Sequence, residues 1–240
     1  MRITIVLLVL AVPLLAQLYL IDQPTPFSLM HGEYYIDARF QNEGGMLVHF
    51  GIGLFDRLTL GASYGGNGFL GASTPTFFPR VGFQARVAIA SEDETFLPDI
   101  GLGYDDQGFG DYDNTDKQYQ VKGKGFYLSL GKTLDVSNTY FVFGPNYWIG
   151  SNKRKGLSGF IAAKQTLSEH WDLILEYDLN IGRAEHESKR GFLNLGISWT
   201  FTENLTFTLT LKDIFKNRWD INGKPAGMNR ALNVSFHELF

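Results

Sequence analysis

The sequence predicts an all-β fold: a single antiparallel transmembrane β-barrel of about twelve strands, preceded by an N-terminal signal peptide. The first observation is that large apolar residues alternate strictly with small or polar ones along the segment 193–211. This pattern indicates β-strands because successive strand side chains point to opposite faces. The second is that the connections between predicted strands alternate between short and long. The third is an export signal without any apolar run of about 20 residues, the length that a spanning helix needs.

The segment 193–211 is a predicted hairpin in which both arms carry one wholly apolar face. These faces consist of Leu193, Leu195, Ile197, Trp199 and Phe201 in the first arm and Leu205, Phe207, Leu209 and Leu211 in the second. In a soluble sandwich such a face forms the core. In an outer-membrane barrel it faces lipid, and the polar face lines the interior.

The composition fits alternating strands and excludes several classes of protein. Among 240 residues there are 27 glycines, 15% aromatic residues and 19% charged residues, and the mean hydropathy of −0.09 is too low for a helical membrane protein. The net charge of −4 gives no reason to expect nucleic acid as a partner. The absence of cysteine excludes disulfides, thiolate metal sites, cysteine nucleophiles and lipoprotein attachment.

The chain divides into three predicted parts. Residues 1–16 read as a cleaved signal peptide with a short positive region, an apolar run and a small residue, Ala16, at the expected cleavage site, although an uncleaved anchor is the alternative. Residues 17–28 contain prolines and are expected to be irregular. Residues 29–240 are expected to form the barrel. The terminal aromatic Phe240 ends an amphipathic strand, as in the signal through which barrel-assembly machinery recognises outer-membrane barrels.

Twelve strands are predicted from the alternation, and the seventh and eighth alternate poorly. Their approximate ranges are 29–40, 46–54, 58–64, 81–89, 100–104, 126–130, 139–150, 157–167, 171–181, 193–201, 205–211 and a last strand that closes at Phe240.

Every second connection is short, whereas the others are generally longer and richer in Gly, Asp, Asn or Lys. The short ones are 55–57, 91–95, 135–138, 168–170 and 202–204, and the longer ones are 65–75, 105–117, 151–156, 183–189 and 217–227, with 41–45 as a short exception. Short turns at one rim, long loops at the other and an even strand number are typical of bacterial outer-membrane barrels. Both termini are then expected in the periplasm. A soluble periplasmic sandwich is the alternative fold.

The alternation also predicts which charged residues face the barrel lumen. The acids are Glu33, Asp37, Asp99, Asp172, Glu176 and Asp178, and the bases are Arg39, Arg80, Arg86, Lys164, Arg190 and Lys212. Because the two signs balance, the sequence leaves open an ion-paired, plugged lumen and a weakly selective pore; buried charges must be paired in the first case.

No pattern of catalytic, cofactor-binding or metal-binding residues emerges. In the acidic loop 105–117, Asp111 and Asp113 have calcium-loop spacing, but Asp116 replaces the required glycine. His31 and His49 are expected to project inward as hydrogen-bonded fillers, because no Ser–His constellation accompanies them. The segment 185–187 lacks the zinc-binding HExxH spacing, and the glycines of 65–68 precede no helix.

Three tryptophans, Trp148, Trp171 and Trp199, are expected in aromatic girdles at the two membrane interfaces.

Several stretches carry a resemblance to a known family. They are LIDQPTPFSLMHGEYYIDARF, GLFDRLTLGASYGG, LPDIGLGYDDQGFGDYD with KGKGFYLSLGK, LILEYDL, LNLGISWTFTENL and NRALNVSFHELF. Together they resemble bacterial outer-membrane β-barrel proteins of the YjbH-like group, some of which are associated with exopolysaccharide production. The shared motifs are turns and strands, so the resemblance implies the barrel and its location and carries over no catalytic residue.

The expected function is that of a non-enzymatic barrel in the outer membrane of a diderm bacterium, acting as a pore or accessory for export or passage of saccharides or other small solutes. A structural or assembly-partner barrel with a plugged lumen is the alternative, and an outer-membrane hydrolase is a third. Outer-membrane lipid, the barrel-assembly machinery and a saccharide or small solute are the expected partners, and no cofactor is expected.

Overall fold

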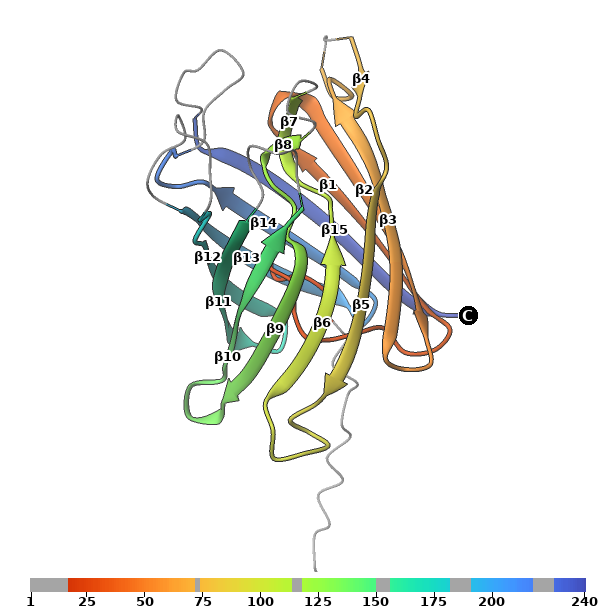
Figure 1. Ribbon diagram of the computed structural model, residues 1–240, viewed down its shortest axis with the longest axis vertical. Helices are drawn as coiled ribbons and strands as arrows, with labels where there is room; N and C mark the ends of the chain where they lie inside the picture. The colour runs from red at the N-terminus through yellow and green to blue at the C-terminus, as the bar shows by residue number, and fades with distance from the viewer. Residues whose placement is uncertain (1–16, 72–73, 114–117, 150–155, 182–190, 218–226) are drawn as a thin grey trace, which may run out of the picture.

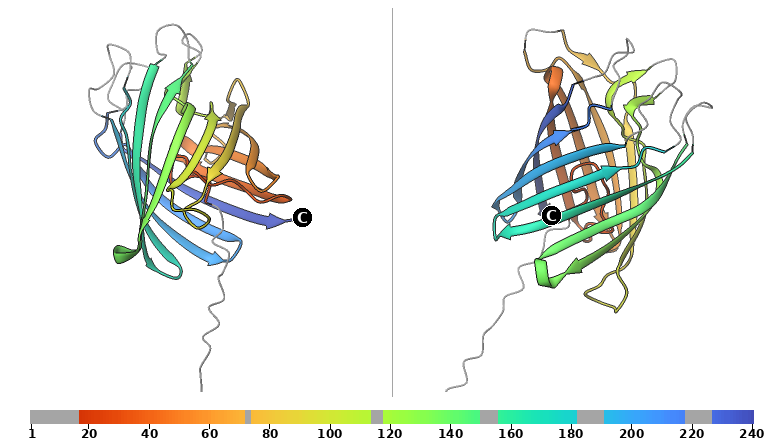
Figure 2. Two further views of the ribbon diagram at one scale, coloured as in Figure 1. Left: turned by 60° about the horizontal axis from the view of Figure 1, so that its bottom comes forward. Right: turned by 90° about the vertical axis from the view of Figure 1, so that its left-hand side faces the viewer.

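A computed structural model describes residues 17–71, 74–113, 118–149, 156–181, 191–217 and 227–240, which form a closed antiparallel β-barrel (Figures 1 and 2). The wall strands are β1 (Glu33–Gln41), β2 (Gly45–Leu54), β3 (Leu58–Asn67), β5 (Gly82–Ala90), β6 (Asp99–Asp105), β9 (Gly125–Leu134), β10 (Thr139–Trp148), β11 (Gly156–Ser168), β12 (Trp171–Asp178), β13 (Phe192–Thr202), β14 (Leu205–Lys212) and β15 (Asn229–Leu239). The predicted twelve-stranded antiparallel barrel is therefore confirmed.

The barrel closes where the first strand meets the last. β1 pairs with β15 in a register that joins Glu33 to Leu239 and Gln41 to Ala231. On its other side β1 pairs with β2, and the remaining wall strands pair in the order β2, β3, β5, β6, β9 and onward to β15. Closure leaves no free sheet edge, which is the condition for strands to cross a hydrocarbon layer.

The two rims differ as the sequence predicts. The short-turn rim carries the connections β2–β3, β5–β6, β9–β10, β11–β12 and β13–β14, together with the start of β1 and the end of β15. The long-loop rim carries the other connections. Of these, the link between β1 and β2 is the short exception: a single 3-10 turn, η1 (Asn42–Gly44).

Three short strands are additions that the alternation did not predict. β4 (Thr76–Phe77) extends the sheet beside the end of β3. β7 (Phe109–Asp113) lies inside the predicted acidic loop 105–117 and pairs with β8 (Gln118–Val121), which follows that loop, in a separate two-stranded hairpin. Their sequence is too polar and too rich in aspartate to read as strands without the packing of Tyr119 against Phe78 and Leu47.

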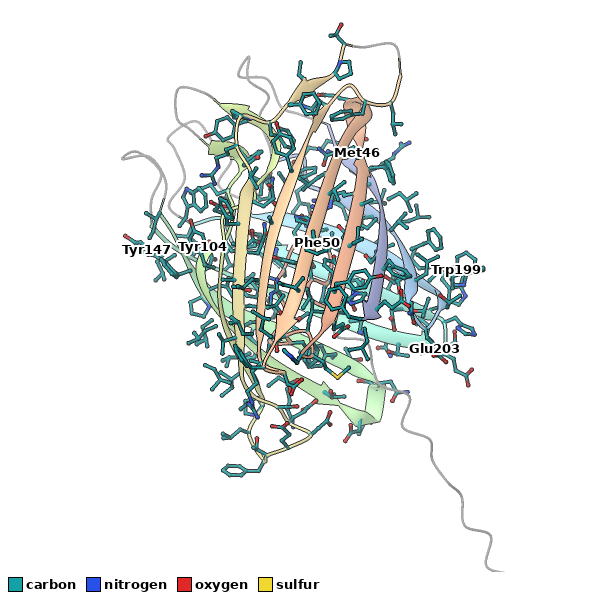
Figure 3. All side chains as sticks on the ribbon, turned by 90° about the vertical axis from the view of Figure 1, so that its right-hand side faces the viewer. Met46, Phe50, Tyr104, Tyr147, Trp199 and Glu203 are labelled. Atoms are coloured by element: carbon teal, nitrogen blue, oxygen red, sulfur yellow. The ribbon has the colours of Figure 1, made fainter. Side chains whose placement is uncertain are left out.

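The outer face of the wall is apolar (Figure 3). Phe50, Leu102, Ile161 and Leu209 project outward from four different strands and are each about half exposed. No helix in the described parts of the chain has the length and apolar character needed to cross a membrane.

Aromatic rings gather on the outer wall near the short-turn rim. The rings of Trp171 and Trp199 are stacked with centroids 5.9 Å apart, and Phe201 and Phe207 pack beside them. The prediction that Trp148 belongs to such a girdle is wrong. Trp148 shares the inward face of β10 with Val142 and Asn146 and is only 6% exposed, because the strand alternates through to its end.

We expect Leu209→Arg to destabilise the barrel in lipid vesicles by about 2–4 kcal/mol, the cost of a cation on the lipid face near the bilayer midplane. Urea unfolding followed by tryptophan fluorescence measures this difference. Phe55→Arg is the matched control, because Phe55 is 76% exposed in the β2–β3 turn at the rim. Equal stabilities of the two variants would contradict a lipid-facing outer wall.

Candidate luminal site

The segment that precedes β1 folds back into the barrel. Backbone bonds from Leu20 N to Gln23 O and from Thr25 N to Leu18 O, both 3.1 Å, close a tight hairpin with a bridge between Tyr19 and Pro24. We call residues Leu18–Thr25 the luminal hairpin. It is surrounded by wall side chains from seven strands: Arg39, Arg86, Asp105, Ser129, Glu176, Asn194 and Lys212.

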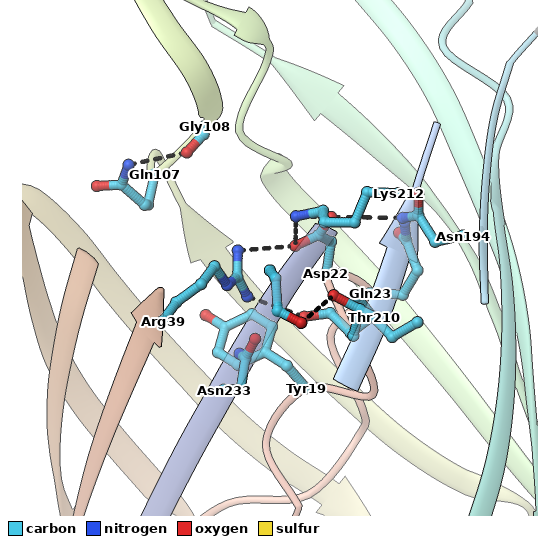
Figure 4. Close-up of polar contacts among 12 residues, drawn as sticks. Tyr19, Asp22, Gln23, Arg39, Gln107, Gly108, Asn194, Thr210, Lys212 and Asn233 are labelled. Carbon is cyan, nitrogen blue, oxygen red and sulfur yellow. Dashed lines mark hydrogen bonds and ion pairs between the residues drawn. The ribbon is translucent and has the colours of Figure 1, made fainter. Parts of the chain in front are cut away.

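The hairpin enters the lumen from the short-turn rim. The connection to β1 is anchored there by the N–H of Gly32, which donates to Gly53 O, and by the N–H of His31, which donates to the Asp56 carboxylate in the β2–β3 turn. The N–H of Leu29 donates to Thr59 Oγ1 at 2.8 Å. From this anchored end the chain reaches inward, and its tip lies beside the far ends of β1, β13 and β14 (Figure 4).

The side chain at the tip, Asp22, is held by cations of the wall. Arg39 Nη1 lies 2.9 Å from Asp22 Oδ1, and Lys212 Nζ lies 2.7 and 2.6 Å from the two carboxylate oxygens. Asn194 Nδ2 donates to Oδ2 at 3.4 Å. Figure 4 shows the three donors converging on this one carboxylate from β1, β13 and β14.

The wall returns the interaction through Glu176. Its carboxylate, fully buried on β12, accepts hydrogen bonds from the backbone N–H groups of Ile21 at 2.6 Å, Asp22 at 3.0 Å and Gln23 at 3.0 Å. A turn with three N–H groups aimed at one point is an anion-binding nest. The hairpin thus supplies the Asp22 carboxylate and the N–H donors for Glu176, and the wall supplies the Glu176 carboxylate and the donors for Asp22.

The hairpin also has an apolar side. Leu20 and Ile21 pack against Tyr127, Val142, Phe160 and Ile174, and Phe27 stacks on Tyr140 with ring centroids 5.4 Å apart. Arg86 lies over the Tyr19 ring at 4.3 Å and donates to the carbonyl of Leu18. Ion pairs and apolar contacts therefore both hold the hairpin.

A second element covers the hairpin from the long-loop rim. Phe109, at the start of the β7–β8 hairpin, is buried, and its ring centroid lies 3.6 Å from Lys212 Nζ on the opposite wall. Between the two hairpins is a cavity of about 50 Å³ lined by Asp22, Arg39, Lys124, Asn194 and Lys212. A space of this size holds water molecules and no saccharide ring.

The predicted lumen-facing residues separate into two groups. Arg39, Arg86, Glu176 and Lys212 contact the hairpin, and Asp178 lines the cavity, where it pairs with Lys124. Lys164 Nζ donates to the side chain of Gln17 at 3.1 Å, just before the hairpin.

The second group pairs within the wall. Glu33 contacts His237, Asp37 accepts from His49, Asn233 and Ser235, Asp99 accepts from the Tyr140 hydroxyl, and Asp172 accepts from Thr166. Arg190 lies outside the described residues.

Two expected inward positions need correction. Arg80 lies at the long-loop rim, where it pairs with Asp106 at 2.8 Å, because β5 begins only at Gly82. His31 lies exposed at the short-turn rim, where its ring stacks on Phe55 and its Nδ1 accepts from the Phe55 N–H, because β1 begins only at Glu33. His49 does face inward and is hydrogen-bonded to Asp37 at 3.3 Å.

Asp105, Asp106 and the glycines of 65–68 have structural roles in the described part of the chain. Asp105 and Asp106, from the predicted acidic loop, are buried and bind Tyr19 and Arg80. Gly65 and Gly66 belong to β3. The described residues contain no group of three acidic or histidine side chains able to hold a metal ion. Asp116, the segment 185–187 and the predicted signal peptide at 1–16 are outside the described residues.

The sequence did not single out the residues at the centre of the site. Asp22 lies in a segment expected to be irregular, and Asn194 is one of many polar residues on strand faces. The sequence signal is a single acid, Asp22, in a proline-containing segment that precedes a barrel with balanced interior charges. This signal does not identify Glu176, which lies 154 residues further along the chain, as a partner.

Electrostatics keep Asp22 ionised. Burial alone raises the pKa of this carboxyl, but the adjacent Lys212 and Arg39 outweigh burial and hold the pKa well below its usual value. Tyr19 responds in the opposite sense, because burial and the neighbouring Asp105 carboxylate raise the pKa of its hydroxyl. At neutral pH the Asp22 carboxyl is therefore an anion, and the Tyr19 hydroxyl is neutral and donates a hydrogen bond.

Solved structures with a related architecture include the KdgM porin, at a TM-score of 0.52 and 11% identity over 84% of this chain and 98% of that chain. The fold is porin-like. A structure of the KdgM porin in complex with disordered oligogalacturonate aligns at a TM-score of 0.52 and 9% identity over 87% of this chain and 99% of that one. The NanC porin aligns at 0.49 and 9% identity over 86% and 99%. No protein-family model matches the chain, and no curated protein matches its sequence.

We expect Glu176→Gln to loosen the luminal hairpin without opening the wall. The substitution replaces charge-assisted hydrogen bonds, each worth about 1.5–3 kcal/mol, with weaker neutral ones. Amide hydrogen exchange at residues 21–23 should accelerate by roughly 10- to 100-fold, since each 1.4 kcal/mol is a factor of about ten.

Asp172→Asn on the same face of β12 is the matched control for this variant, because Asp172 contacts Thr166 and lies away from the hairpin. Its exchange rates at residues 21–23 should equal those of the wild type. Equal acceleration in both variants would show that Glu176 acts on the wall as a whole.

The hairpin anchor should also fail in acid. The pKa of Asp22 is lower in the folded chain than in the unfolded chain, so its stabilisation is complete at neutral pH, above the unfolded value of about 3.9, and is lost as the pH falls through the folded value. The facing groups are Arg39, Lys212, Lys124 and Glu176.

The measurement is the stability difference between wild type and Asp22→Asn as a function of pH. We expect about 3 kcal/mol in favour of the wild type at pH 7, the order of a broken buried ion pair. The difference should shrink steadily below about pH 4. A difference that is constant from pH 7 to pH 2 would refute the role assigned to the Asp22 charge.

Proposed function

We propose that the chain is a non-enzymatic outer-membrane barrel for the passage of saccharides or other small solutes, and that the luminal hairpin closes it. The observation that carries this proposal is that wall side chains hold the hairpin, whereas no described wall strand pairs with it. The twelve wall strands pair only with one another and with β4 in the described parts of the chain. The hairpin adds no strand to that wall, so it can leave without breaking a backbone hydrogen bond between wall strands.

The polar interior supports passage over a purely structural role. With the hairpin withdrawn, the wall would present Arg39, Arg86, Asn194 and Lys212 to water, on strands whose outer face stays apolar. A barrel of twelve strands is larger than the eight-stranded type that its own side chains fill. Its lumen needs an inserted segment to be closed.

Two resemblances support a saccharide as the solute. One solved porin of similar fold is described in complex with oligogalacturonate. The motifs LIDQPTPFSLMHGEYYIDARF and NRALNVSFHELF support membership of the YjbH-like group, in which some proteins are associated with exopolysaccharide production.

The location belongs to the same proposal. A cleaved signal peptide at 1–16 would deliver the chain to the periplasm, and barrel-assembly machinery would insert it through the C-terminal strand. The exposed Phe240 ring, stacked on Tyr34 at 5.2 Å, offers that machinery an aromatic end on β15. The apolar outer face then contacts outer-membrane lipid, with the short-turn rim in the periplasm.

A second candidate is a permanently plugged structural or assembly-partner barrel. The apolar packing of Leu20 and Ile21 against β9, β10, β11 and β12 favours it, because such contacts are lost on every opening. The two candidates differ in one measurable property, which is whether loosening the hairpin opens a conducting path.

Planar-bilayer conductance of the refolded chain tests the choice. We expect the wild type to be closed with rare openings and Asp22→Ala/Glu176→Gln to conduct for at least tenfold more of the recording time. Asp172→Asn should behave as the wild type. If every variant is electrically silent while heat-modifiable gel migration proves a folded barrel, the passage function is wrong and the structural candidate stands.

A further inference from the structure

Three nitrogen donors of the wall converge on a single carboxylate. Arg39, Lys212 and Asn194 come from β1, β14 and β13, and all three are less than 7% exposed. Two cations and an amide are groups that commonly bind a carboxylate. Arg39 donates from Nη1 to Asp22 Oδ1 and from Nη2 to the carbonyl of Ile21, so both nitrogens are used by the hairpin. The carboxylate they hold belongs to the hairpin, which is not part of the wall.

The charge of the cluster depends on the hairpin. With the hairpin in place, Arg39 and Lys212 are balanced by Asp22 and the adjacent Glu176. Lys124 is already paired with Asp178. Withdrawal of Asp22 leaves the same place with one unbalanced positive charge on the wall of the lumen, which attracts anions into it.

The cavity above Asp22 has unused hydrogen-bonding capacity. Within the described residues, Arg39 Nε is buried and has no hydrogen-bond partner, and Arg39 lines the cavity. Phe109 and Phe192, which do not belong to the hairpin, line the same cavity with aromatic rings. Charged and amide groups beside aromatic faces suit a sugar ring that carries a carboxylate.

We propose that Arg39, Lys212 and Asn194 form a carboxylate-binding site in the lumen, that Asp22 occupies it as an internal ligand, and that a carboxylate-bearing saccharide competes with Asp22 for it. The saccharide part rests on the proposed function, whereas the site itself rests on the geometry. Binding of such a solute and retention of the hairpin are then mutually exclusive at this point of the lumen.

Equilibrium binding to the refolded full-length chain tests the site without any use of conductance. Asp22→Ala removes the carboxylate and keeps Cβ, so acetate serves as a small carboxylate probe and acetamide is its neutral control. We expect acetate, at constant ionic strength, to raise the unfolding temperature of Asp22→Ala and to bind it at least tenfold more tightly than the wild type. Acetamide should have no effect on either protein.

The site residues are tested on the same background. Asp22→Ala/Lys212→Met should lose the response to acetate, whereas Asp22→Ala/Lys132→Met should keep it, because Lys132 pairs with Glu92 at the short-turn rim. A response that survives loss of Lys212, or a response to acetamide equal to that of acetate, overturns the proposed site.

Competition by a saccharide is tested on the wild-type chain, so this experiment needs no folded variant. Galacturonate should accelerate hydrogen exchange at residues 20–23 at least tenfold, whereas galactose should not. Equal effects of the two sugars, or none, overturn the competition. Carboxylate binding by a non-conducting barrel would uphold this site and refute the passage function, and conduction without carboxylate binding would do the reverse.

Discussion

A strand in hydrocarbon must have every backbone N–H and C=O group paired, and this constraint shapes the whole molecule. The wall satisfies it by joining β1 to β15, so that no edge remains. Strand geometry puts successive side chains on opposite faces of the wall, so that the apolar face lies outside and the polar face lines the lumen. A barrel of this size then has an interior that its own strands do not fill, and the segment before β1 fills it.

The fold could be predicted from the sequence because its signal is local. Alternation within β12 places Trp171, Leu173 and Leu175 outside and Asp172 and Glu176 inside, and each assignment depends on neighbours two residues away. The strands with weak alternation, β10 and β11, contain Gly144 and Pro145 or Ala162 and Ala163, which carry little signal for either face. Tertiary pairing with their neighbours decides those strands.

The luminal site could not be predicted in the same way, because its contacts are distant in sequence. The balanced interior charges indicate that acids and bases are paired. The number of interior charges does not tell whether a charge pairs with another wall residue or with a residue of a separate segment. Asp22 meets Lys212 across 190 residues, and the Glu176 nest uses backbone N–H groups that no side-chain pattern reveals. Arg86 likewise binds a carbonyl and a ring in place of the expected carboxylate.

The short connection from the hairpin to β1 has a consequence for any molecule that competes with Asp22. Residues 26–32 tether the hairpin to the rim, so the departing carboxylate stays within a few nanometres of the site and returns at an effective concentration of the millimolar order. A monovalent solute with the same affinity as Asp22 must exceed that concentration to hold the lumen open. In a polymer with a carboxylate on each sugar unit, the neighbouring unit can bind the site when one unit leaves it. The length of the polymer, more than the affinity of one sugar, would therefore set the solute concentration needed to displace Asp22.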